Sequence, residues 1–317
     1  MLRAVLPGPL TSLVNRDELK QAAGRCAVAF VEYEQLARVD GASLRIPIIA
    51  IVDSRPADTL GATIRALDEY PWLSHVISAG LLATPRAPAH LAAVIERFAG
   101  GPAEPLLGRA GVGRVALLAT ASRRTARFDR MRDFFARQAL SERAIVTILE
   151  VAEELVMNAL YDAPSEAGYF HRPRQRVEDV DLPHHLACEI SYGIEDDIVF
   201  VRLRDPFGAL PRARLVEVLV RCNSRSVALD ESRGGAGLGL WRVFSTAAHV
   251  AITVIPGALT DVVIGIATRD GRAIPKQQLQ SLHLFFAPRS EHYESLAIVA
   301  DDDHGLLDQS ITINHVA

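Results

Sequence analysis

The chain has little of what marks a membrane, secreted or metal-binding protein. Its 317 residues include only three cysteines, Cys26, Cys188 and Cys222, which lie far apart and form no CxxC pair. This usage fits a reducing compartment and gives neither a disulfide framework nor a zinc site. No apolar run reaches the roughly 18 residues of a membrane span, and Pro7 and Pro9 interrupt an N-terminus that lacks the signal-peptide pattern. The sequence therefore predicts a cytoplasmic protein.

A surplus of one charge is also missing. The 34 Lys and Arg residues against 38 Asp and Glu residues give a formal net charge of −4. Such a balance argues against binding to nucleic acid or to an anionic membrane through overall positive charge. What is present is a composition that is 49% hydrophobic over a length typical of two globular domains.

The first domain is expected over residues 1–100, as an α/β domain. Apolar runs predict strands, and amphipathic patterns between and after them predict helices. The expected strands are 26–31, 46–52 and 75–82, and the expected helices are 59–70 and 88–98. Alternation of strand and helix is typical of a doubly wound sheet. A Gly- and Pro-rich linker is expected over 101–111.

This order of elements, with the phrase RIPIIAIVD at 45–53, resembles the second half of a response-regulator receiver domain. A receiver carries a phospho-accepting aspartate after the strand at 26–31, where this chain has Glu32 and Tyr33. The acidic pair that binds Mg²⁺ in receivers is missing too. The resemblance thus implies a degenerate receiver-like domain that binds other proteins.

The second domain is expected over residues 112–287, as an α+β sandwich that begins with helices. Two helical patterns, 126–140 and 141–163, precede strands at 186–194, 197–204, 249–256 and 260–267. Helices on one face of a largely antiparallel sheet are the expected arrangement. Residues 288–317 are acidic and aperiodic, so we expect a flexible tail with at most a short helix or strand.

Two polar motifs of the second domain have a structural and a functional interpretation. Glu154 and Asn158 are four residues apart, which places both on one helix face. Such pairs are also common on solvated helices. Asp205-Pro-Phe-Gly208 follows a predicted strand, which is typical of a turn. The functional interpretation is a buried carboxylate that accepts a hydrogen bond from an amino group such as that of adenine.

A third motif is glycine-rich. Gly235, Gly237 and Gly239 open a predicted helix, so the backbone can approach a ligand closely and the helix N-terminus can face an anion. A flexible loop has the same composition. A dinucleotide-binding Rossmann site is excluded, because its glycines directly follow a strand and here a polar stretch precedes them.

In this order and spacing, and with Thr260 in the final hairpin, the motifs resemble those of the GHKL (Bergerat-fold) ATPases and kinases. Glu154 and Asn158 match the N box, Asp205 and Gly208 the G1 box, and the three glycines the G2 box. The resemblance implies ATP and Mg²⁺ as cofactors. It implies that Asp205 and Thr260 hold adenine, Asn158 the Mg²⁺ and the glycines the phosphates, while Glu154 is the catalytic base.

One motif departs from the family. The G1 box is usually DxGxG, whereas this chain has Phe207 in place of the first glycine and Ala209 in place of the second. Both replacements restrict the backbone torsion angles, and Phe207 adds bulk near the expected base pocket. Nucleotide affinity and phosphate transfer are therefore in question. Residues 209–234 would form the ATP lid, in which Arg225 and Arg233 are candidate phosphate contacts or plain solvated side chains.

Within the superfamily the layout is similar to that of the anti-sigma-factor serine kinases. No histidine lies between His90 and His171, and neither His75 nor His90 precedes an acidic residue, which argues against a self-phosphorylating histidine kinase. Topoisomerase-type relatives continue into a long transducer domain that is not expected here. The resemblance implies a partner protein, such as a sigma factor or its antagonist. The oligomeric state stays open, although relatives often form homodimers.

Two functions follow from these expectations. The first is an ATP-dependent protein serine/threonine kinase in a partner-switching circuit, favoured by the intact Glu154–Asn158 pair. The second is a non-catalytic, nucleotide-sensing adaptor, favoured by the altered G1 box and the degenerate first domain. Loss of phosphate transfer in Glu154→Ala, with nucleotide binding retained, would separate them.

Overall fold

The structure of the chain is a computed structural model. It describes residues 2–4, 11–13, 28–41, 46–53, 59–98, 107, 112–223, 238–273, 279–286 and 309–312. The chain divides into two compact units, residues 1–106 with 278–284 and residues 107–277 with 285–317. Each unit combines helices with β-sheet, so the fold class is mixed α and β.

The sheet of the first unit has a parallel centre and antiparallel edges. Its strands lie in the order β12 (Ser281–Phe286), β5 (His75–Ser78), β4 (Ile48–Val52), β3 (Ala29–Glu32), β1 (Leu2–Ala4) and β2 (Thr11–Leu13). The pairs β3–β4 and β4–β5 are parallel, whereas β12–β5, β1–β3 and β1–β2 are antiparallel. The unbroken apolar sequence of β4 fits this central place, because four of its five residues are buried.

The helices of the first unit are η1 (Tyr33–Arg38), α2 (Thr59–Glu69), α3 (Ala79–Leu82) and α4 (Ala87–Phe98). The core is an apolar cluster from β3, β4, β5, α3 and α4, made of Val28, Phe30, Ile49, Ile77, Leu81 and Val94. The expected strand 75–82 is wrong beyond Ser78. The Ser78 hydroxyl accepts a hydrogen bond from the Leu81 N–H at 3.1 Å and so starts helix α3.

The sheet of the second unit is antiparallel throughout. Its strands lie in the order β13 (Gln309–Thr312), β6 (Val112–Leu118), β7 (Cys188–Glu195), β8 (Ile198–Asp205), β10 (Leu259–Arg269) and β9 (His249–Ile255). A short strand, β11 (Arg272–Ala273), pairs with β10. The long hairpin of β9 and β10 confirms the two strands expected at the end of this domain.

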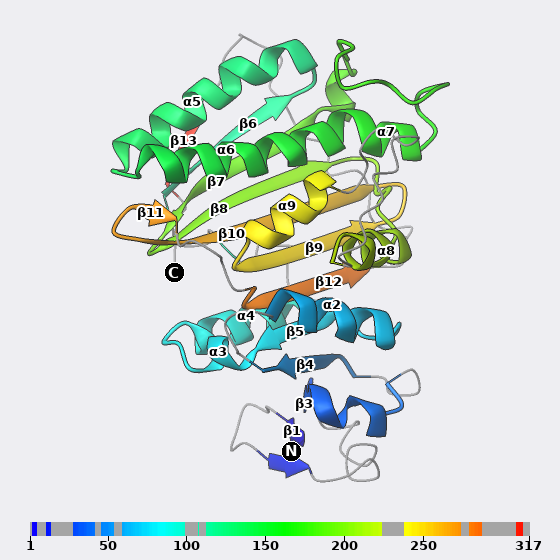
Figure 1. Ribbon diagram of the computed structural model, residues 1–317. Coiled ribbons are helices and arrows are strands. Elements are labelled where there is room, and N and C mark those ends of the chain that lie inside the picture. Colours follow the sequence, from blue (N-terminus) through cyan, green and yellow to red (C-terminus); the bar gives the residue numbers. More distant parts are fainter. Residues whose placement is uncertain are drawn as a thin grey trace. The chain divides into compact units, whose positions relative to one another are not determined.

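The helices of the second unit are η2 (Ala121–Arg123), α5 (Arg124–Arg137), α6 (Glu142–Met157), the π-helical η3 (Asn158–Asp162), α7 (Ala163–Glu166), η4 (His184–Leu186), α8 (Arg212–Asn223) and α9 (Leu238–Thr246). Helices α5, α6 and α9 lie on one face of the sheet (Figure 1). The apolar side of α6 is buried there, including Ile145, Ile148, Ala152 and Leu155. Ser141 caps this helix by accepting a hydrogen bond from the Ala144 N–H, as the sequence predicts.

Two expectations about the ends of the second domain differ from the structure, and a third, about the tail, is compatible with it. The second unit begins with strand β6, not with a helix, and β6 pairs with both β7 and β13. Residues 278–284 were expected within the second domain, but they belong to the first unit because β12 pairs with β5. Within the segment expected as a tail, residues 309–312 form β13, which is the short strand that the sequence allowed for.

Candidate functional site

Asp205 and Thr260 lie opposite each other at adjoining ends of β8 and β10. Antiparallel pairing puts the two residues in register, and each is only 5% exposed. Burial raises the pKa of Asp205 from 3.8 to about 7, although hydrogen bonds from the Phe207 and Gly208 N–H groups and the nearby Thr260 hydroxyl lower it in part. Among the described residues, the Thr260 hydroxyl has no hydrogen-bond partner of ordinary geometry. The strand ends thus hold a buried acceptor beside an unsatisfied hydroxyl.

A second buried aspartate on the same strands shows how unusual this arrangement is. Asp261 receives two hydrogen bonds from the Arg202 guanidinium, at 2.9 and 2.7 Å. That pair spans β8 and β10 and neutralises the Asp261 charge. In the part of the chain that the structure describes, no cation pairs with Asp205 in this way. Asp205 thus lacks the charged partner that Asp261 has.

The turn after β8 explains the Asp205-Pro-Phe-Gly208 sequence locally. The Asp205 Oδ1 atom accepts a hydrogen bond from the Phe207 N–H at 3.0 Å, as an aspartate at the start of a turn does. Gly208 has a φ of 58°, and a Cβ atom there would overlap the backbone of the β9–β10 turn. Gly208 is therefore required by the backbone itself. Phe207 is buried, and its ring lies 6.1 Å from that of Tyr169.

The N-box residues lie where α6 passes into the π-helical turn η3. Glu154 is on the last turn of α6, and Asn158 is the first residue of η3. Helix α9 packs beside α6, and the ion pair of Arg242 with Glu150, at 2.6 Å, joins the two helices. A Cβ atom on Gly239 would overlap the Glu154 carboxylate, so this glycine lets the carboxylate lie against the first turn of α9.

Arg176 and Asp162 complete this face, and the sequence did not single out either of them. The Arg176 guanidinium donates to the Glu154 carboxylate at 3.0 Å, and to the Asn158 side-chain oxygen and the Asp162 carboxylate at 3.3 Å each. Desolvation lowers the pKa of Arg176, but the two carboxylates outweigh it and the net pKa is raised. The alternating arginines of the loop after α7 were the available sequence signal.

The structure brings the candidate residues together in two groups. Asp205, Gly208 and Thr260 form the group at the strand ends, and Glu154, Asn158 and Gly239 form the group between α6 and α9. Helix α6 and η3 pack on β8, and Tyr169 reaches Phe207, which links the groups.

Several expected features fall elsewhere. Gly235 and Gly237 lie outside the described residues, as do Arg225 and Arg233. Within the expected lid 209–234, residues 212–223 form helix α8.

The chain matches no protein-family model, no curated protein and no solved structure. The described helices include none that is long and apolar enough to cross a membrane. Over the same residues, no group of three or more His, Cys, Asp or Glu side chains is arranged to hold a metal ion.

Proposed function

We propose that the chain is an ATP-binding signalling regulator with a GHKL-type second domain and a receiver-like first domain. The observation that carries the proposal is the contact of Glu154 with the first turn of α9 at Gly239. These residues belong to two motifs that are far apart in the sequence. If Glu154 and Asn158 were only a solvated pair and the glycine motif only a flexible loop, contact between them would not be expected.

The strand-end group suits an adenine base. The Asp205 carboxylate accepts hydrogen bonds, and the Thr260 hydroxyl can both donate and accept. A buried hydroxyl without a partner is costly, and so is a buried carboxylate without a cation. An exocyclic amino group that donates to Asp205 would offset that cost and favour the ionised carboxylate.

The group between α6 and α9 suits the phosphates. The N-terminus of α9 would offer backbone N–H groups to an anion, and Gly239 lets the Glu154 carboxylate lie against this first turn. The side-chain oxygens of Asn158 and Glu154 already hold one cation, the Arg176 guanidinium. In this proposal Asn158 would hold Mg²⁺, which would neutralise charge on the phosphate oxygens.

In the kinase form of this function, Glu154 accepts the proton of a serine or threonine hydroxyl of the partner protein. The hydroxyl oxygen forms a bond to the γ-phosphorus, the bond from that phosphorus to the β–γ bridging oxygen breaks, and ADP leaves. The products are a phosphorylated partner and ADP, with the proton on Glu154.

The second candidate function is a nucleotide sensor without catalysis, and one contact favours it. In the structure the Glu154 carboxylate is held by Arg176, so it is not presented to a nucleophile. The bulk of Phe207 beside Asp205 also favours the sensor without catalysis. In this form, nucleotide binding would change the contacts of the protein with its partners without phosphate transfer.

Calorimetric titration of Mg-ATP and Mg-ADP into the purified chain tests the proposal. We expect binding at about millimolar affinity or tighter, about −4 kcal/mol or better, and its loss in Asp205→Asn. Asp270→Asn, an exposed aspartate in the turn after β10, is the matched control and should bind as the wild type does. Phosphate transfer that Glu154→Ala abolishes selects the kinase form. Absence of nucleotide binding in the wild type refutes both forms.

A further inference from the structure

One positively charged side chain occupies the face on which the proposed function needs a metal ion. The Arg176 guanidinium contacts an oxygen from each of Glu154, Asn158 and Asp162 within 3.0–3.3 Å. Residues spaced by four drift around a regular α-helix, which has 3.6 residues per turn. The wider π-helical turn from Asn158 to Asp162 compensates for this drift and keeps Asp162 on the same face. π-turns are frequent at functional sites.

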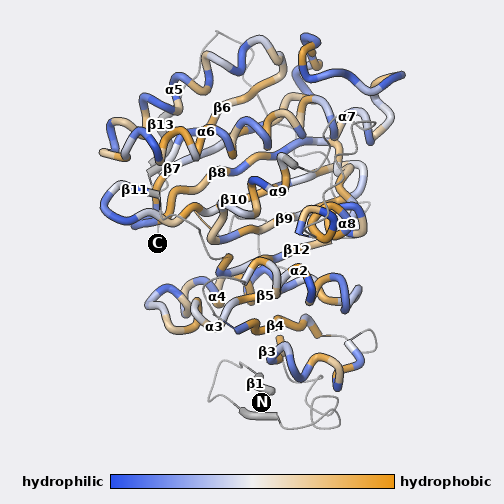
Figure 2. Tube along the Cα trace, in the orientation of Figure 1, coloured by the Kyte–Doolittle hydropathy of each residue, from blue (hydrophilic) through white to orange (hydrophobic). Residues whose placement is uncertain are grey.

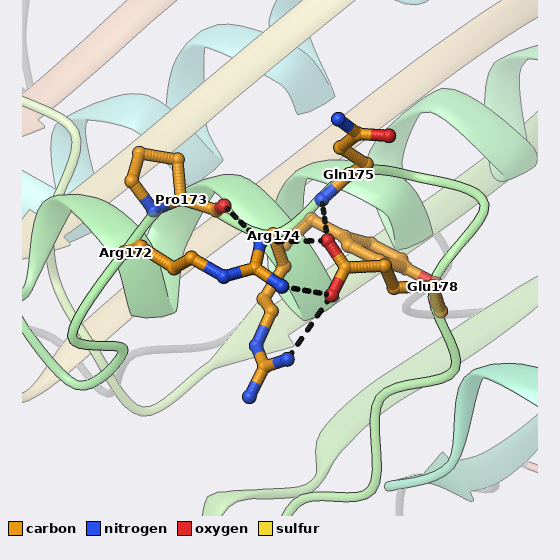
Figure 3. Close-up of polar contacts among 6 residues, drawn as sticks. Arg172, Pro173, Arg174, Gln175 and Glu178 are labelled. Carbon is orange, nitrogen blue, oxygen red and sulfur yellow. Dashed lines mark hydrogen bonds and ion pairs between the residues drawn. The ribbon is translucent and has the colours of Figure 1, made fainter.

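The segment that carries Arg176 also has contacts of its own that do not involve Arg176. The Glu178 carboxylate accepts hydrogen bonds from Arg172 at 2.9 and 2.8 Å, from Arg174 at 3.1 Å and from the Gln175 N–H at 2.9 Å (Figure 3). These contacts lower the pKa of Glu178 to about 2, led by the hydrogen bond from Arg172. The carboxylate therefore gathers residues 172–178 into a closed turn.

This turn is tied to the rest of the second unit at its far end. The Tyr161 hydroxyl, on η3, donates to the Glu178 carbonyl oxygen at 2.6 Å. Beyond it, Asp179 and Asp181 accept hydrogen bonds from the connection between β6 and α5. The loop after α7 is otherwise strongly hydrophilic (Figure 2). Arg176 can therefore leave Glu154 while the turn keeps its own contacts.

The three oxygens form an incomplete metal site. Two carboxylates and one amide oxygen suit Mg²⁺ or Mn²⁺, which also take water or phosphate ligands. On the other side, the first turn of α9 at Gly239 closes off the Glu154 carboxylate. A guanidinium and a divalent cation would thus compete for the same oxygens.

We propose that Arg176 is a latch, an internal cation that masks the Glu154–Asn158–Asp162 face and must leave before a divalent cation binds there. The inference rests on the proposed function and concerns the regulation of its site. In the latched state Glu154 is neutralised and cannot serve as a base. Arg176 is a positioning residue in this account, because it acts through Glu154.

The test measures Mn²⁺ binding without nucleotide, by electron paramagnetic resonance of the free ion. Arg176→Met keeps a flexible, unbranched side chain and removes the charge and the hydrogen-bond donors. Arg172→Met is the matched control, because Arg172 belongs to the same turn and pairs with Glu178. We expect Arg176→Met to bind Mn²⁺ at least tenfold more tightly than the wild type, and Arg172→Met to show no gain. Equal affinity in Arg176→Met and wild type, or equal gains in both variants, overturns the latch.

A second arm assigns the gain to this face. Adding Asp162→Asn to Arg176→Met should remove most of the gain, and a gain that persists places the metal elsewhere and overturns the inference. Should Arg176→Met fail to fold, hydrogen–deuterium exchange of residues 169–177 in the wild type decides: exchange that rises with Mn²⁺ supports the latch, and unchanged exchange at saturation refutes it. The two proposals can fail separately. If the variants bind Mn²⁺ as predicted but the chain binds no nucleotide, the proposed function is refuted and the latch is supported.

Discussion

Asp205→Asn should make the protein more stable at pH 8 than the wild type and should lose that advantage in acid. The substitution keeps the shape of the side chain and the acceptor for the Phe207 N–H, but removes a buried charge that no cation neutralises among the described residues. Binding sites commonly keep such destabilising groups, and their removal then stabilises the fold.

The magnitude follows from the pKa. The pKa of Asp205 rises from 3.8 to about 7 on folding, so the folded state binds more protons than the unfolded state between these values. Stability contributed by this residue therefore increases as the pH falls from 7 toward 3.8. At about 1.4 kcal/mol per pKa unit, the ionised carboxylate destabilises the fold by about 4 kcal/mol at pH 8 and by about 2 kcal/mol at pH 5.

Urea denaturation of the wild type and the variant at both pH values measures this effect. The gap in unfolding free energy between the variant and the wild type should narrow by about 2 kcal/mol from pH 8 to pH 5. Contacts of the amide that are lost or gained do not titrate, so they cancel in this difference. A gap that is independent of pH, or a wild type that is the more stable at pH 8, would mean that Asp205 is only the cap of its turn.

Three further predictions concern the stability of the two units. Gly208→Ala should lower the unfolding free energy by at least about 2 kcal/mol, because its φ is 58° and a Cβ would overlap backbone; urea denaturation measures this, and a neutral result contradicts the turn geometry. Ser141→Ala removes the cap of α6 and should cost about 1 kcal/mol, seen as a lower Tm, whereas Ser141→Asp should retain most of it. Burial lowers the pKa of His75 to about 3 and of His90 to about 4, so the stability of the first unit is complete above pH 6.5 and falls below it, by about 2 kcal/mol per histidine at pH 5. His75→Phe should remove about half of this acid sensitivity in urea denaturation, and an unchanged pH dependence would contradict the assignment.

The periodic parts of the fold were the predictable ones. The apolar stripe and the Ser141 cap define α6 because they depend only on local spacing. The apolar runs that form β4 and the β9–β10 hairpin are equally local. The run at 75–82 was misread because its apolar residues suit either a strand or a buried helix, and Ser78 decides between them through one hydrogen bond.

The parts that depend on long-range contacts were not predictable in the same way. The pairing of β12 with β5 links segments from opposite ends of the chain, and no local pattern specifies it. At the site, the motif residues could be named from their order, whereas Arg176 could not, because its role comes from the folding of a loop against η3. The burial of Asp205 likewise arises from tertiary packing that its turn sequence does not specify.

The measurement that tests the central claim most directly compares Mg-ATP with Mg-inosine triphosphate on the wild-type protein. The two nucleotides share sugar and phosphates, but inosine has an oxygen where adenosine has the amino group that would donate to Asp205. We predict that ATP binds at least tenfold more tightly at pH 8, and that this preference disappears in Asp205→Asn. Equal affinity of the two nucleotides for the wild type, or no binding of either, would contradict the assignment of Asp205 and Thr260 to an adenine base.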